Sequence, residues 1–129
     1  MRASHLIAAV CAAVLQTACG AATAQAYPSK PVRLVVPFSP GGGNDIAARF
    51  VAQRLGEGFN QSAVVDNRPG ANYIIGTEIV ARAPADGYTL LVAPSSAAIS
   101  QTLYRNLSFD LARDFDAVGM FAQGPFMLV

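Results

Sequence analysis

Short apolar runs alternate along the chain with glycine-rich or polar segments and with apolar residues at helical spacing. The first run, residues 32–36, is continuous and rich in β-branched side chains, which is typical of a strand buried on both faces of a parallel sheet. Residues 63–65 and residues 88–93 predict two further strands, and Asp86-Gly87 marks a turn before the third.

A helix is expected after the first predicted strand, because apolar side chains recur at helical spacing between residues 46 and 55. Asn44 or Asp45 is the expected N-cap of this helix. Gly56 and Gly58 are expected to break it, since glycine is a poor helix former.

The same spacing predicts a helix over residues 74–83, which Pro84 stops, and a third helix over residues 97–104. A fourth strand is expected at residues 117–122. The order β-α-β-α-β-α predicts an α/β domain with a parallel sheet and helices on both faces. In such domains ligands gather where the loops leave the carboxyl ends of the strands.

The amino-terminal segment has the pattern of an export signal. A positively charged start precedes the apolar run of residues 6–15, and Ala24-Gln25-Ala26 offers the small residues that a signal peptidase accepts. The apolar run is shorter than the roughly 20 residues that span a bilayer. We therefore expect cleavage after Ala26 and a periplasmic location. Lipidation of Cys19 is the less favoured alternative, because Gln16 stands where a lipobox has an aliphatic residue.

Removal of residues 1–26 takes away His5, Cys11 and Cys19, so the rest of the chain has neither histidine nor cysteine. Nucleophilic triads then lack their base, and a zinc site lacks its commonest ligands. Nine basic residues less Arg2 leave eight, against eight acidic residues, which is not the basic excess of a nucleic-acid-binding domain. We expect a small-molecule partner, no enzyme activity, no cofactor, no metal and no nucleic acid.

The loop after the first predicted strand carries the strongest ligand chemistry. Gly41-Gly42-Gly43 at a helix start exposes N–H groups, and the helix dipole adds partial positive charge, so an anion can dock there. The glycines do not match the dinucleotide fingerprint, because Ile46 occupies its last glycine position, nor do they match a P-loop. A tight turn without a ligand is the alternative for the glycines. Asp45 either contacts a ligand or caps the helix.

Two other loops leave the same predicted edge. The hydroxyls of Ser95-Ser96 either donate to a carboxylate or cap the third helix. Arg68 suits bidentate recognition of a carboxylate, but a salt bridge to Asp66 or another acidic residue is the preferred interpretation. Phe38 and Tyr73 either wall a pocket or belong to the core.

Four stretches of sequence stand in an order and at separations that are typical of one family. They are Tyr27 to Phe38 followed by Pro40-Gly41-Gly42-Gly43-Asn44-Asp45, then Asn67-Arg68-Pro69-Gly70-Ala71, then Ala85-Asp86-Gly87-Tyr88-Thr89-Leu90-Leu91, and lastly Leu103-Tyr104 leading to Asp114-Phe115. Together they resemble the motifs of the tripartite tricarboxylate transporter receptors, also called the Bug family, over nearly all of the chain after residue 26.

The resemblance implies a monomeric, two-lobed periplasmic binding protein of type II architecture. Such a protein holds a carboxylated solute between its lobes and passes it to integral membrane subunits without chemical change. The resemblance assigns residues 38–45 to gripping a carboxylate through backbone groups and bridging waters. By their position, residues 72–76 and Ser95-Ser96 are expected to supply the other ligand contacts of this lobe. The candidate ligand-binding residues are Phe38, Ser39, Gly41, Gly42, Gly43, Asn44, Asp45, Asn72, Tyr73, Ser95 and Ser96.

Two features depart from the family pattern. Residues 71–76 include bulky side chains where glycines are usual, so Tyr73 reshapes the pocket, and the ligand stays open among di- and tricarboxylates, amino acids and aromatic acids. The chain is also about half as long as a two-domain receptor, and it stops in an apolar run. We therefore expect residues 1–26 to be a signal peptide and residues 27–129 to be an incomplete first lobe. An enzyme domain that binds a phosphorylated cofactor at Gly41-Gly42-Gly43 and a non-functional truncated receptor are the alternatives.

Overall fold

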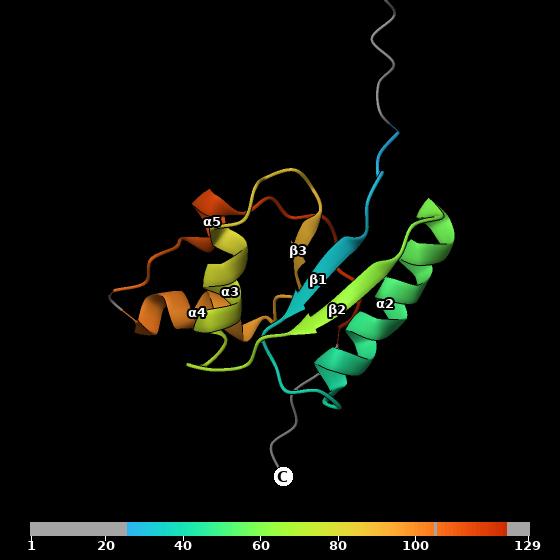
Figure 1. Ribbon diagram of the computed structural model, residues 1–129. Coiled ribbons are helices and arrows are strands. Elements are labelled where there is room, and N and C mark those ends of the chain that lie inside the picture. The colour runs from blue at the N-terminus through green and yellow to red at the C-terminus, as the bar shows by residue number, and fades with distance from the viewer. Residues whose placement is uncertain (1–25, 105, 124–129) are drawn as a thin grey trace, which may run out of the picture.

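A three-stranded parallel sheet lies between helices in the computed structural model, which describes residues 26–104 and 106–123 (Figure 1). The strand order is β2-β1-β3, and both neighbouring pairs are parallel. This arrangement confirms the predicted α/β class. The elements are β1 (Val32–Val36), α2 (Gly43–Phe59), β2 (Ala63–Asn67), α3 (Ile74–Ala81), β3 (Thr89–Leu91), α4 (Ser96–Leu103) and α5 (Leu111–Asp114).

The two crossovers place helices on opposite faces of the sheet. The chain passes from β1 to β2 in one direction and then returns across β1 to reach β3. Since crossovers of this type are right-handed, α2 and α3 must cover different faces. Figure 1 shows α2 on one side and α3 with α4 on the other. The carboxyl end of β1 is therefore the point at which loops diverge to opposite faces, the usual ligand position in open α/β sheets.

The central strand β1 is buried on both faces, as its continuous apolar sequence predicts. Val32, Leu34 and Val36 pack with Ala48 and Ala52 of α2 in the main core cluster. Val35 points to the other face, because side chains alternate along a strand, and it too has no exposed surface. Each such aliphatic side chain contributes about 1.5–3 kcal/mol when it is fully buried.

Helix α2 runs through the two glycines that were expected to break it, so that prediction is wrong. The helix continues past Gly56 and Gly58 and ends at Asn60, which adopts the left-handed conformation with φ 51°. A glycine within a helix costs about 1 kcal/mol relative to alanine. The packing of Val51 and Leu55 against the core outweighs that cost.

The predicted N-cap of α2 at Asn44 or Asp45 is also wrong. The N-cap is Gly42, with extended backbone angles, and no side chain caps it. Asp45 lies in the first turn, and its carboxylate accepts a hydrogen bond from the N–H of Gly41 instead. The sequence pattern identifies the start of the helix but not the direction in which this carboxylate turns.

The predicted strand at residues 117–122 is wrong, since this segment is neither strand nor helix. A strand forms only where a neighbouring strand pairs with it, and this segment lies beside α2, where Phe121 and Ala122 line a hollow. The short helix α5 was not predicted. Its signal is Asp110, whose carboxylate accepts from the N–H groups of Ala112 and Arg113.

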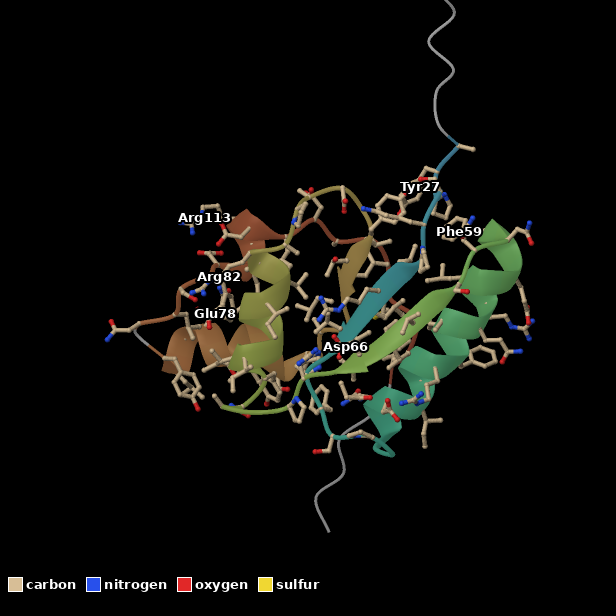
Figure 2. The ribbon with its side chains drawn as sticks, viewed as in Figure 1. Tyr27, Phe59, Asp66, Glu78, Arg82 and Arg113 are labelled. Carbon is tan, nitrogen blue, oxygen red and sulfur yellow. The ribbon has the colours of Figure 1, made fainter. Side chains whose placement is uncertain are left out.

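Tyr27 is part of the packed structure. Its hydroxyl donates to the carbonyl of Gly87 at 2.7 Å, and its ring contacts Tyr88 and Phe59 at centroid distances of 5.0 and 6.2 Å. Figure 2 shows Tyr27 and Phe59 side by side, at the end of the sheet away from Asp66. The expected signal peptide and Cys19 lie outside the described residues, except for Ala26. Within the described ranges, no helix combines the length and apolar character needed to span a membrane.

Candidate functional site

Three loops leave the carboxyl edge of the sheet, and two of them are packed closely together. The N–H of Arg68, just after β2, donates to the carbonyl of Val36 at the end of β1 over 2.8 Å. Gly76 of α3 lies against both loops, since a Cβ at this position would come within 2.7 Å of the Pro37 Cβ and 2.9 Å of the Arg68 carbonyl oxygen. The absence of a side chain at Gly76 thus lets α3 approach this edge.

The glycine loop presents backbone donors to solvent at the start of α2. Gly41 has φ 84°, a conformation that favours glycine. Ile46 donates its N–H to the carbonyl of Gly42, which is the first backbone bond of the helix. The N–H groups of Gly42, Gly43 and Asn44 find no acceptor in the described part of the chain, and all three residues are exposed. The positive end of the helix dipole lies at the same place, so the loop is suited to a carboxylate.

Asp45 lies beneath this loop and is only 2 % exposed. Its Oδ1 accepts from the side-chain amide of Asn67 at 2.9 Å. Its Oδ2 accepts from the N–H of Gly41 at 2.9 Å and from Nε of Arg49 at 3.0 Å. The hydrogen bond from Arg49, with those from Gly41 and Asn67, lowers the pKa of Asp45 to about 2. The carboxylate is therefore ionised at neutral pH, with both of its oxygens bonded to protein groups.

Arg49 and Asn67 belong to this arrangement, although neither is among the candidate ligand-binding residues. Asn67 also donates to the carbonyl of Phe38 at 3.1 Å, and its Oδ1 accepts from Nη2 of Arg49 at 3.3 Å. The spacing between Asp45 and Arg49, one helical turn, is a signal that could have identified the ion pair. Asn67 could be found only from the adjacency of the β1 and β2 ends.

Phe38 and Tyr73 are brought together from different loops. Their ring centroids are 5.4 Å apart with an interplanar angle of 47°, and both side chains are half-buried. Ala71, Asn72 and Tyr73 have consecutive positive φ angles of 45°, 53° and 65°. Non-glycine residues in this conformation are strained. The amide of Asn72 donates to the hydroxyl of Ser100 at 3.4 Å, which links this loop to α4.

Ser95 and Ser96 lie at the start of α4, after the third strand. Ser95 is the N-cap of α4, but no side-chain hydrogen bond caps the helix. The carbonyl of Ser96 accepts from the hydroxyl of Ser100 at 3.2 Å. The capping role considered from sequence is therefore not observed, and no hydrogen bond joins these serines to the glycine loop among the described residues.

Arg68 pairs with Asp66, which confirms the preferred interpretation of that arginine. Its Nε lies 3.0 Å from Oδ1 of Asp66, and Nε of Arg33 donates to Oδ2 at 2.8 Å. Burial alone would raise the pKa of Asp66, but the hydrogen bonds and charges of the two arginines together lower it. Figure 2 shows Asp66 at the carboxyl edge of the sheet.

Two hollows lie beside the loops rather than among all three of them, and one of these hollows is lined in part by Gly43. One, of about 370 Å³, is lined by Ile74, Glu78 and Tyr104, with residues 106–108. Another, of about 570 Å³, lies along α2 beside Phe121. Within the described ranges, no group of three or more His, Cys, Asp or Glu side chains could hold a metal ion. The candidate residues thus form an open surface.

This fold and edge define one lobe of a periplasmic binding protein of type II architecture. The structure of R. palustris Rpa4515 with adipate matches 67% of this chain and 29% of that chain, with a TM-score of 0.62 and 40% identity. MatC (Rpa3494) from Rhodopseudomonas palustris with bound malate matches 74% of this chain and 33% of that chain, with a TM-score of 0.64 and 28% identity. The partial coverage of both structures corresponds to a first lobe.

The sequence comparisons identify the family. Residues 47–129 match the family described as tripartite tricarboxylate transporter family receptor. Protein BugT of Bordetella pertussis is 40% identical over 109 residues, 83% of this chain and 33% of BugT. A protein of the tcbD-tcbE intergenic region of Pseudomonas sp. (strain P51) is 36% identical over 125 residues, 97% of this chain and 37% of that protein.

The chain belongs to the tripartite tricarboxylate transporter receptor family, a family of transport receptors and not a class of enzyme. It spans about a third of the length of the curated relatives that it matches.

Proposed function

We propose that this chain supplies one wall of the ligand site of a solute-binding receptor that captures a small carboxylate. The observation that carries the proposal is the set of exposed N–H groups of Gly42, Gly43 and Asn44 at the point where the loops diverge. Family membership supports it, and so do the adipate and malate named with two similar structures. We propose that the receptor passes its ligand to integral membrane subunits of a tripartite tricarboxylate-type transporter.

A carboxylate at the glycine loop accepts hydrogen bonds from the backbone, directly or through water, and gains from the helix dipole. The rings of Phe38 and Tyr73 wall the apolar part of the ligand, while the amide of Asn72 and the hydroxyls of Ser95-Ser96 add polar contacts. Small-molecule sites bury about 70–90% of their ligand, and these loops are largely exposed. A facing second lobe is therefore needed for tight binding.

We propose that residues 1–26 are a signal peptide removed after Ala26 and that residues 27–129 form part of the first lobe of a monomeric periplasmic receptor. The packing of Tyr27 against Phe59 and Tyr88 supports the inclusion of Tyr27 in the folded lobe. The alternatives of an enzyme domain and of a non-functional product have no observation of their own in their favour.

A thermal-shift panel on the full-length protein tests the proposal. Citrate, malate, adipate, glutamate and benzoate represent the acid classes, and at least one should raise the melting temperature, because binding to the native state alone stabilises it. A ligand at about 100 times its Kd should raise the free energy of unfolding by about 2.7 kcal/mol.

Gly42→Leu is the diagnostic variant. A Cβ at Gly42 meets only the Ser39 carbonyl oxygen, at 3.7 Å, so the fold accepts a side chain there while the side chain covers the donors. Gly58→Leu, on the same helix with no heavy atom within 4 Å of its Cβ, is the matched control. Loss of the shift in Gly42→Leu alone supports the proposal. If none of the acids raises the melting temperature, the proposal is contradicted. A response to inorganic phosphate alone would favour the cofactor-binding alternative.

A further inference from the structure

Two residues outside the candidate ligand-binding set donate hydrogen bonds to the buried carboxylate that lies beneath the glycine loop. Asn67 is the last residue of β2, and Arg49 lies one turn after Asp45 in α2. Both donate to Asp45, and Nη2 of Arg49 also donates to the Asn67 side-chain oxygen. The three side chains thus form a closed set of hydrogen bonds between a helix and the neighbouring strand.

This set holds both ends of the loop. Asn67 donates to the carbonyl of Phe38, where the loop begins, and Asp45 accepts from the N–H of Gly41, where the chain turns into the helix. Because the bond to Asp45 occupies the N–H of Gly41, the donors left for a ligand are those of Gly42 and the residues after it. Loss of Asn67 would free the Phe38 carbonyl and one oxygen of Asp45 together.

The charges in the set matter to an anionic ligand. Asp45 puts a negative charge in the first turn of the same helix that offers donors to a carboxylate, and two like charges near each other repel. The Arg49 side chain is 56% exposed and touches the Asp45 carboxylate, so it neutralises this charge at the place where the ligand arrives. Arg54, which lies further along α2, pairs with Glu57 instead.

We infer that Arg49 and Asn67 are positioning residues of the carboxylate site, Asn67 by holding the shape of the glycine loop and Arg49 by neutralising Asp45 beneath it, without contact between either residue and the ligand. The inference rests on the proposed function, but part of its test needs no ligand.

The first experiment measures affinity by calorimetry for an acid that the thermal-shift panel detects. Arg49→Gln should weaken binding about five- to tenfold at low salt and less at high salt, because it leaves the Asp45 charge uncompensated. Asp45→Asn removes the charge that Arg49 neutralises, and it is therefore the background in which the effect of Arg49→Gln is measured again. In that background Arg49→Gln should change the affinity by less than about twofold, because no negative charge is left to neutralise.

Arg54→Gln is the matched control, an arginine of the same helix whose loss should leave affinity unchanged. If Arg49→Gln weakens binding as much in the Asp45→Asn background as it does in wild type, then Arg49 contacts the ligand directly and the inference is wrong. If Arg49→Gln lowers the melting temperature but not the affinity, the role is structural only, which also overturns the inference.

The second experiment measures hydrogen exchange of the Gly41 amide in the ligand-free, full-length protein. Asn67→Ala and Arg49→Gln should each speed exchange at Gly41 by at least about tenfold while the amides of β1 keep their protection, because the Asp45 acceptor is no longer held. Asn106→Ala, an exposed asparagine elsewhere, is the control. Unchanged exchange at Gly41 in both variants would overturn the positioning role even if no acid binds, whereas failure of the acid panel alone would count only against the proposed function.

Discussion

The hydrogen bonds of Asp45 give this residue a role that its position in the sequence does not indicate. From sequence it is an acidic residue at a helix start, for which a cap or a ligand contact is the natural interpretation. In the structure it is buried, and its carboxylate is bonded by Asn67, Gly41 and Arg49. The carboxylate is therefore a structural anion, and its ionisation contributes to the stability of the loop.

A pH dependence follows from that ionisation. The pKa of Asp45 falls from the ordinary 3.8 to about 2, with the hydrogen bond from Arg49 as the largest cause. The folded state thus binds the proton less tightly than the unfolded state, so the stabilisation is fully present above about pH 4 and is lost as the pH falls toward about 2. The free energy of unfolding, measured in urea, should fall more steeply with decreasing pH in wild type than in Asp45→Asn. Equal slopes for the two proteins would contradict the assignment.

At the scale of elements, α2 depends on tertiary packing more than on local propensity. The helix passes through Gly56 and Gly58, although its sequence predicts a break there. Its inner side packs against β1, and Asn60 ends it in a left-handed conformation. Packing of an amphipathic face commonly outweighs propensity in this way.

Gly58→Ala tests the observed extent of α2. A Cβ at this position meets no heavy atom within 4 Å, and the residue lies within the helix, so alanine should raise the free energy of unfolding by about 0.5–1 kcal/mol. Chemical denaturation measures this change. Gly41→Ala is the opposite control, since φ 84° strains an alanine and should lower stability. A Gly58→Ala variant no more stable than wild type would indicate that the helix ends earlier.

At the scale of the whole molecule, the described residues form one face of the proposed ligand site. The carboxyl edge of the sheet brings the glycine loop, the loop at residues 71–73 and the start of α4 to one side (Figure 1). The chain spans about a third of the length of its curated relatives. An open edge of this kind is suited to closure by a second lobe, which is the basis of the proposed receptor function.

The proposed export predicts a defined mature end. Protein recovered from the periplasm should begin at Tyr27, since Ala24-Gln25-Ala26 offers the processing site. Intact mass and amino-terminal sequencing measure this end. Ala26→Arg should block processing and serves as the comparison. A product that retains residues 1–26, or one that begins at a lipid-modified Cys19, would contradict the proposal.

The sequence alone determined the α/β class, the order of the three strands along the chain and the positions of the loops, because these depend on local periodicity and turn chemistry. The motifs also indicated the family that the comparisons then showed. The Arg68–Asp66 ion pair was predictable as well, since its partners are two residues apart.

Only the tertiary structure decided which residues meet at the edge of the sheet. Asn67 reaches Asp45 across 22 positions of sequence, and Phe38 packs on Tyr73 because β1 and β2 end side by side. Residues 117–122 do not form the predicted strand because their apolar pattern supplies no pairing partner. The path of α2 through its glycines was likewise decided by packing. Local sequence patterns set the helix or strand propensity of each segment. Contacts between distant segments decide which helices and strands form and which residues pair with a buried charge such as Asp45.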